Sequence, residues 1–79
     1  MDNEYYNKII ITEDNKEYQV IWVSNINSQK CLYILNVNDY SDILFAKVID
    51  NNALDIIIDK EEIISLVRIM NKEMNLFLR

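Results

Sequence analysis

The chain has 79 residues and a formal net charge of −5, and it contains neither histidine nor glycine. Without histidine there is no Ser-His-Asp or Cys-His arrangement and no HExxH zinc helix, and without glycine there is no phosphate-binding loop. These absences exclude the common hydrolases, NTPases and dehydrogenases, and the negative charge with scattered lysines and arginines predicts no direct binding of nucleic acid.

The chain before residue 59 reads as short β-strands separated by polar turns. Each predicted strand is rich in β-branched or aromatic residues, and every connection falls on Asn, Asp or Ser. Because the connections are short and hold no helix, we expect an antiparallel meander. With no glycine, the Asn, Asp and Ser residues must supply the left-handed turn positions. The five predicted strands are Lys8–Thr12, Glu17–Ser24, Lys30–Asn36, Ile43–Ile49 and Leu54–Ile58.

An amphipathic helix is predicted from Asp59 to Arg79. Asp59 is a suitable N-cap residue, and Glu62 three residues later completes a capping-box pattern. The helix should cover one face of the sheet, which gives a single α+β domain over residues 1–79, with the sheet in 8–58 and the helix in 59–79. Its apolar stripe consists of Ile63, Leu66, Val67, Met70, Met74, Phe77 and Leu78.

The apolar residues of the strands exceed what one sheet face can hold. The face under the helix is expected to consist of Tyr18, Val20, Trp22, Leu44, Ala46 and Val48, with Leu32 and Ile34 beside them. The residues left over are Ile21, Val23, Phe45, Ile57, Ile64, Ile69 and Leu76. Either they form an exposed patch that contacts another protein, or a strongly curved sheet buries residues on both of its faces.

The chain carries no signal for export or for a membrane. It opens with MDNEYYNK, which lacks a basic start followed by an apolar core, and no segment approaches the roughly 20 apolar residues of a membrane span. We therefore expect a cytoplasmic protein, with Cys31 as a buried thiol. Many Ile and Asn beside no Gly or Pro suggest an AT-rich genome, such as that of a low-GC bacterium, a phage or a mobile element.

Acidic residues gather between Asn36 and Glu62, where only Lys47 and Lys60 oppose them. A negative field of this kind steers a protein toward a basic groove. The predicted partner-binding residues are Asp39, Tyr40, Asp42, Asp50, Asp55, Glu61 and Glu62. The competing interpretation is that these acids are merely solvated on loops and at a helix cap.

Carboxylate chemistry is the enzymatic option that the composition leaves open. Asp39 with Asp42, or Asp50, Asp55 and Asp59 together, could hold Mg²⁺ or move a proton. Aspartates at turns and helix starts are nevertheless expected for local structural reasons. We therefore predict no catalytic residue, no metal ligand and no cofactor.

The order of these segments is similar to that of the YrzB-like family of small acidic Firmicute proteins of unknown function. The resemblance spans roughly residues 8–70 and rests on Tyr18, Tyr33, Phe45 and the acidic run Asp59–Glu62 before an apolar helix. This chain lacks the turn glycine and the dense acidic loop of that pattern. The resemblance implies no catalytic residue.

Size, charge and missing chemistry together predict a non-enzymatic protein that acts by stoichiometric binding of another protein. An inhibitor from a phage or mobile element, directed at the basic channel of a nucleic-acid-handling host protein such as a defence nuclease, fits this description. The alternative is a YrzB-like cytoplasmic protein that forms a homodimer and serves as a structural or scaffold module.

Overall fold

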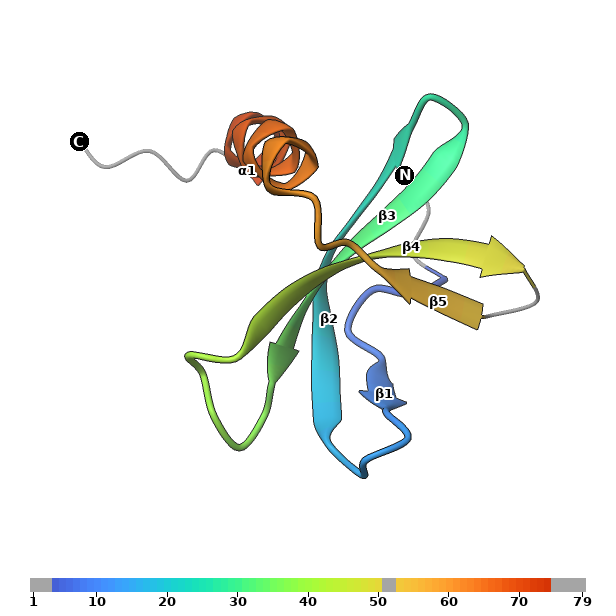
Figure 1. The fold of residues 1–79 in the computed structure, drawn as a ribbon, viewed down its shortest axis with the longest axis vertical. Coiled ribbons are helices and arrows are strands. Elements are labelled where there is room, and N and C mark those ends of the chain that lie inside the picture. Colours follow the sequence, from blue (N-terminus) through green and yellow to red (C-terminus); the bar gives the residue numbers. More distant parts are fainter. Residues whose placement is uncertain (1–3, 51–52, 75–79) are drawn as a thin grey trace.

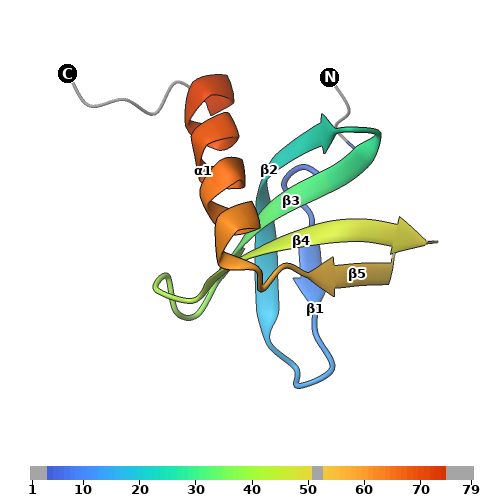
Figure 2. The same cartoon turned by 45° about the horizontal axis from the view of Figure 1, so that its top comes forward.

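A five-stranded antiparallel sheet and one helix make up the fold (Figure 1). The computed structural model describes residues 4–50 and 53–74. Each strand pairs with its neighbours in chain order, so the predicted meander with a C-terminal helix on one face is confirmed. Figure 2 shows helix α1 lying along the outside of the curled sheet. The elements are β1 (Ile9–Ile11), β2 (Glu17–Ile26), β3 (Gln29–Asn36), β4 (Ile43–Asp50), β5 (Ala53–Ile56) and α1 (Lys60–Met74).

Asparagine and serine take the left-handed positions that glycine usually fills. Asn7, Asn15, Asn27 and Ser28 all have positive φ. Asn27 and Ser28 alone connect β2 to β3, and their φ angles of 52° and 65° are those of a type I′ hairpin, whose twist matches that of the strands. The expectation that Asn and Ser would serve these turns is confirmed, although this connection is shorter than the sequence indicated.

A bulge in β2 changes which residues share a face. Val20 pairs with Ile34 but Trp22 pairs with Tyr33, so Ile21 is an extra residue in the ladder. Tyr18 and Val20 consequently face one side of the sheet and Trp22 faces the other. The prediction that these three residues share the helix-covered face is wrong, because one inserted residue reverses the alternation.

Both faces of the sheet are buried, as the interpretation of a strongly curved sheet required. The helix-covered face contains Phe45 and Ile57, two of the apolar residues that exceed the predicted face. The opposite face, which we call the inner face, contains Leu44 and Val48, and both are predicted under the helix. The buried residues of the helix-covered cluster are Trp22, Cys31, Phe45, Ile57, Leu66 and Met70, and those of the inner cluster are Tyr18, Val20, Leu32 and Ile34.

Helix α1 is anchored at both of its described ends. Asp59 caps the start, since its carboxylate accepts the Glu62 N–H at 3.1 Å. Near the other end, Glu73 accepts hydrogen bonds from Trp22 Nε1 at 3.2 Å and from Ser24 Oγ at 2.9 Å. Of the predicted stripe, Ile63, Leu66, Val67 and Met70 pack on the sheet, Met74 is 37% exposed, and Phe77 and Leu78 lie outside the described residues.

Candidate partner-binding surfaces

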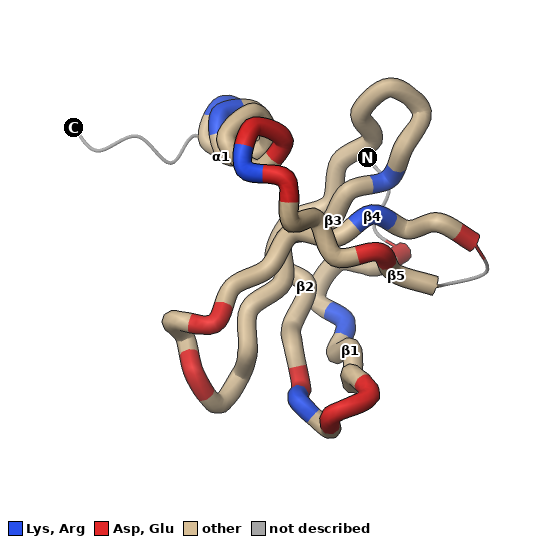
Figure 3. Tube along the Cα trace, viewed as in Figure 1, with Lys and Arg blue, Asp and Glu red and all other residues tan. Residues whose placement is uncertain are grey.

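The seven predicted partner-binding residues fall into two groups. Asp39, Tyr40 and Asp42 belong to the loop between β3 and β4, whereas Asp50, Asp55, Glu61 and Glu62 surround β5 and the start of α1. The loop lies just before β4, and Asp50 is the last residue of β4. At 3.3 Å per residue, the length of β4 places about 25 Å between Asp50 and the loop. Figure 3 shows the acidic positions spread in this way. The seven residues therefore do not form one continuous surface.

The loop between β3 and β4 is held by its own polar groups. The Asp39 carboxylate accepts hydrogen bonds from the Ser41 N–H at 3.1 Å and from the Ser41 hydroxyl at 2.6 Å. Asn36 is buried, and its side-chain oxygen accepts the Asn38 N–H at 2.8 Å. These contacts are Asx turns, which fix the loop without help from a partner. They leave the Tyr40 side chain 72% exposed.

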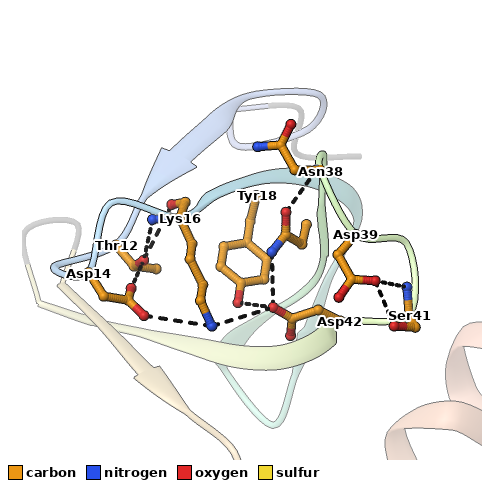
Figure 4. A network of polar contacts seen from close by, with 9 residues as sticks. Thr12, Asp14, Lys16, Tyr18, Asn38, Asp39, Ser41 and Asp42 are labelled. Carbon is orange, nitrogen blue, oxygen red and sulfur yellow. Dashed lines mark hydrogen bonds and ion pairs between the residues drawn. The ribbon is translucent and has the colours of Figure 1, made fainter.

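Asp42 is the centre of a polar network (Figure 4). Its Oδ2 accepts hydrogen bonds from the Tyr18 hydroxyl at 2.7 Å and from Asn36 Nδ2 at 3.0 Å. These bonds, from Asn36 first and Tyr18 second, lower the pKa of Asp42 below its usual value. The same contact with Asp42, together with burial, raises the pKa of Tyr18 to about 12. Asp42 is thus an ionised structural group rather than a carboxylate with all its acceptor sites open.

The turn between β1 and β2 lies beside this loop. Lys16 Nζ is 3.7 Å from Asp14 and 4.0 Å from Asp42, and the Val37 N–H donates to the Glu17 carbonyl at 2.9 Å. The turn, the first residue of β2 and the loop together form what we call the acidic end. Its charged groups are Glu13, Asp14, Lys16, Glu17, Asp39 and Asp42. The acidic end therefore carries five carboxylates and one lysine, and Asp14 and Asp42 lie within 4.0 Å of that lysine.

Sequence reasoning missed the part of the acidic end that the first turn supplies. Glu13, Asp14 and Glu17 lie more than twenty residues before Asp39 in the chain. The predicted meander contained the necessary signal, because alternate turns of an antiparallel meander lie at the same end of the sheet. Counting charges along the chain does not reveal this grouping, because it joins two segments that are distant in the sequence.

The second acidic group is partly neutralised by a lysine. Lys47 Nζ lies 2.6 Å from Glu62 Oε2, and the hydrogen bond with Glu62 raises the pKa of Lys47. Asp55 pairs with Lys47 across β4 and β5. Glu62 is therefore used within the molecule, while Asp50, Asp55 and Glu61 are exposed.

A cleft of 330 Å³ lies beside the Lys47–Glu62 pair and reaches Cys31. Burial raises the pKa of the Cys31 thiol, so this group remains protonated and unreactive at neutral pH. Within residues 4–50 and 53–74, no group of three or more acidic or cysteine side chains is placed to hold a metal ion. The same part of the chain contains no helix with the length and apolarity needed to cross a membrane.

Comparison of the chain with models of known protein families, with curated proteins and with solved structures found no significant match. The resemblance to the YrzB-like family accordingly stays a prediction.

Proposed function

We propose that this is a small non-enzymatic interaction protein that binds a basic surface of another protein through its acidic end. The observation that carries the proposal is the contact between the β1–β2 turn and the β3–β4 loop, where Lys16 lies within 4.0 Å of both Asp14 and Asp42. Glu13, Glu17 and Asp39 add three further carboxylates to these two segments. A concentrated negative field of this kind speeds association with a basic partner and makes it sensitive to salt.

Tyr40 supplies the apolar contact that a charged surface alone lacks. Its side chain is 72% exposed at the tip of a loop whose backbone is already fixed by Asp39 and Asn36. Because the loop backbone is already held by these hydrogen bonds, binding through Tyr40 would cost little backbone entropy, and tyrosine is enriched among the residues that dominate interface energies. In the proposed complex, the acids attract the basic partner and Tyr40 supplies the apolar contact that holds it.

The partner class that suits such a surface is a nucleic-acid-handling protein. The groove of such a protein carries clustered Lys and Arg, which an acidic protein can occupy in place of the phosphate backbone. Stoichiometric occupation of that groove would inhibit the host protein, and this is the role we propose, in a phage or mobile element acting on a host such as a defence nuclease.

A pull-down from a lysate of the source host tests the proposal. The tagged protein should enrich a basic protein at low salt and lose it at high salt, because the interaction is largely electrostatic. The Tyr40→Ala variant should weaken this capture. Failure to enrich a basic protein at low salt would count against the proposal.

A charge-matched pair of variants locates the binding surface. Glu13→Gln with Glu17→Gln removes two charges from the acidic end, and neither side chain takes part in the Asp42 network. Asp55→Asn with Glu61→Gln removes two charges from the other acidic group. Only the first pair should weaken capture, and equal losses would mean that net charge, rather than the acidic end, is recognised.

The alternative function is that of a homodimeric scaffold. It is favoured by exposed apolar side chains on the edge strand β1, where Ile9 is 51% exposed and Ile11 is 66% exposed. Sedimentation at micromolar concentration separates the two functions, since the proposed inhibitor is a monomer until it meets its partner.

A further inference from the structure

A groove separates the two edge strands of the sheet. Among the described residues, β1 pairs with β2 alone and β5 pairs with β4 alone, so the curled sheet stops short of closing into a barrel. Both edges line one groove of 640 Å³. Its apolar lining consists mainly of Ile9, Ile10, Ile11, Ile34, Leu54 and Ile56.

On β1, the backbone groups of Ile9 and Ile11 point toward this groove. The Val20 N–H donates to the Lys8 carbonyl at 2.9 Å, and the Thr12 N–H donates to the Lys16 carbonyl at 2.9 Å. Alternate residues of an antiparallel strand bond to the same neighbour, so the residues at 8, 10 and 12 face β2. The N–H and C=O groups of Ile9 and Ile11 therefore face away from β2.

On β5, the same reasoning turns Leu54 and Ile56 toward the groove. The Ile57 N–H donates to the Phe45 carbonyl at 2.9 Å, and Asp55 pairs with Lys47. The residues at 55 and 57 thus bond to β4, and the backbone groups of Leu54 and Ile56 face away from it. All four residues with outward backbone groups on the two edges line the groove.

The direction of the strands defines what can fill the groove. In a five-stranded antiparallel meander the first and fifth strands run the same way, so a sixth strand antiparallel to both completes a sheet in which every pair is antiparallel. We infer that the groove between β1 and β5 binds an extended segment of a partner protein as a sixth strand, which closes the barrel by pairing with both edges. This is strand addition at two edges at once.

The lining of the groove defines the chemistry of that segment. Alternate side chains of the added strand would point at the inner face, where Ile10, Ile34 and Leu54 are apolar. Two charged residues that flank β1 also line the groove, Lys8 just before the strand and Glu13 after it. A third, Glu4, lines the groove as well and is paired with Lys30 at 3.6 Å. A strand antiparallel to β1 begins near Glu13 and ends near Lys8, so charge complementarity favours a basic residue, then alternating apolar residues, then an acidic residue.

Amide hydrogen exchange with a synthetic peptide tests the inference. The probe is the end-blocked heptapeptide Lys-Val-Thr-Val-Thr-Val-Glu, added at about 1 mM to the full chain. In the free protein the amides of Ile9, Ile11, Leu54 and Ile56 should exchange rapidly, and the peptide should slow all four by about tenfold or more. The amides of Ile10 and Asp55 report the existing ladders and should be protected throughout.

Two controls remove proposed hydrogen bonds. A peptide N-methylated at the amides that would meet the two edges should give no protection. The Ile11→Pro variant removes one outward N–H from an edge strand, a place where proline is tolerated, and should lose protection across both edges. If this variant does not fold, the N-methylated peptide with the unaltered protein decides the question.

Several outcomes would overturn the inference. Protection of the four amides without peptide would mean that the edges are already paired, and protection that grows with protein concentration would mean that a second copy occupies the groove. Protection on one edge only, or none with the heptapeptide, would contradict closure by a sixth strand. The inference shares with the proposed function only the premise of a protein partner. The two are distinguished by the Ile11→Pro variant if it gives no amide protection with the peptide but still captures a basic protein.

Discussion

The two faces of the sheet are completed in different ways. On the helix-covered face the chain supplies its own lid, since Leu66 and Met70 of α1 are 4% and 5% exposed over Trp22 and Phe45. On the inner face Val20, Leu32 and Ile34 are fully buried, but Ile56 at the margin is 38% exposed and the groove between β1 and β5 stays open.

This difference indicates where the stability of the molecule lies. Strands β2, β3 and β4 supply buried residues to one or both clusters, whereas β1 and β5 are short and pair on one side only. Local opening is easiest where few buried contacts hold a segment. We therefore expect β2, β3, β4 and α1 to form the stable unit and the two edge strands to open first.

The largest expected effect comes from truncating the helix-covered core. Phe45→Ala removes a ring that lies 4.6 Å from Tyr33 and 6.3 Å from Trp22 between centroids, and it should lower the free energy of unfolding by about 3–5 kcal/mol. Urea denaturation followed by circular dichroism measures this loss. Leu54→Ala at the open groove should cost less than half as much, because solvent reaches that site and no sealed cavity forms. Equal losses would mean that the two faces are equally closed.

The next largest loss of stability is expected from removing the N-cap of helix α1. Asp59→Ala removes the N-cap bond to the Glu62 N–H and should lower the free energy of unfolding by about 1 kcal/mol. Asp59→Asn keeps an acceptor at the cap and should retain most of that stability. If Asn and Ala cost the same in urea denaturation, the cap bond does not stabilise the helix.

A pH-dependent effect tests the polar network at the acidic end. Because Asn36 and Tyr18 lower the pKa of Asp42 in the folded protein below its ordinary value of 3.8, the network stabilises the fold above that pH. This stability is lost as the pH falls through the folded pKa.

The free energy of unfolding should therefore decline more steeply in the unaltered protein than in Asp42→Asn between about pH 5 and pH 2. Asp50→Asn, an exposed carboxylate at the other end of β4, leaves the network intact and should keep the steep decline. Parallel curves for the unaltered protein and Asp42→Asn would contradict the assignment.

The smallest effect should come from the ion pair between β4 and α1. The side chains of Lys47 and Glu62 are 30% and 36% exposed, so water and salt screen their attraction. A double-mutant cycle with Lys47→Ala and Glu62→Ala should give a coupling energy below the cost of Asp59→Ala, and added salt should reduce it. A coupling energy that does not change at high salt would contradict the expectation that solvent screens this ion pair.

Local sequence signals were enough to predict the elements and their order. The polar breaks located the three turns that lie wholly within the described residues, from β1 to β4, while the predicted turn at 50–52 falls partly outside them. Asp59 marked the start of the helix because an N-cap depends only on nearby residues. The assignment of residues to sheet faces failed at Ile21, since the bulge has no glycine or other local mark. Because of that extra residue, Tyr18 and Val20 lie on the inner face, while Trp22 lies on the helix-covered face expected for it.

The candidate site was predicted only in part, for a related reason. Asp39, Tyr40 and Asp42 were recognised from composition, but the roles of Asp39 and Asp42 depend on partners that only the folded loop brings together. The groove could not be read from periodicity, because it is a property of two strand edges that are distant in the sequence.

Trp22 is the only tryptophan of the chain, and it lies under the end of α1, where it donates to Glu73 and meets the edge of the Phe45 ring. Its intrinsic emission should therefore report whether the helix is docked. Tyr5, which lines the groove, lies on the opposite side of the sheet from this indole. Detachment of the helix can thus be followed by fluorescence in an unlabelled sample, separately from any event at the strand edges.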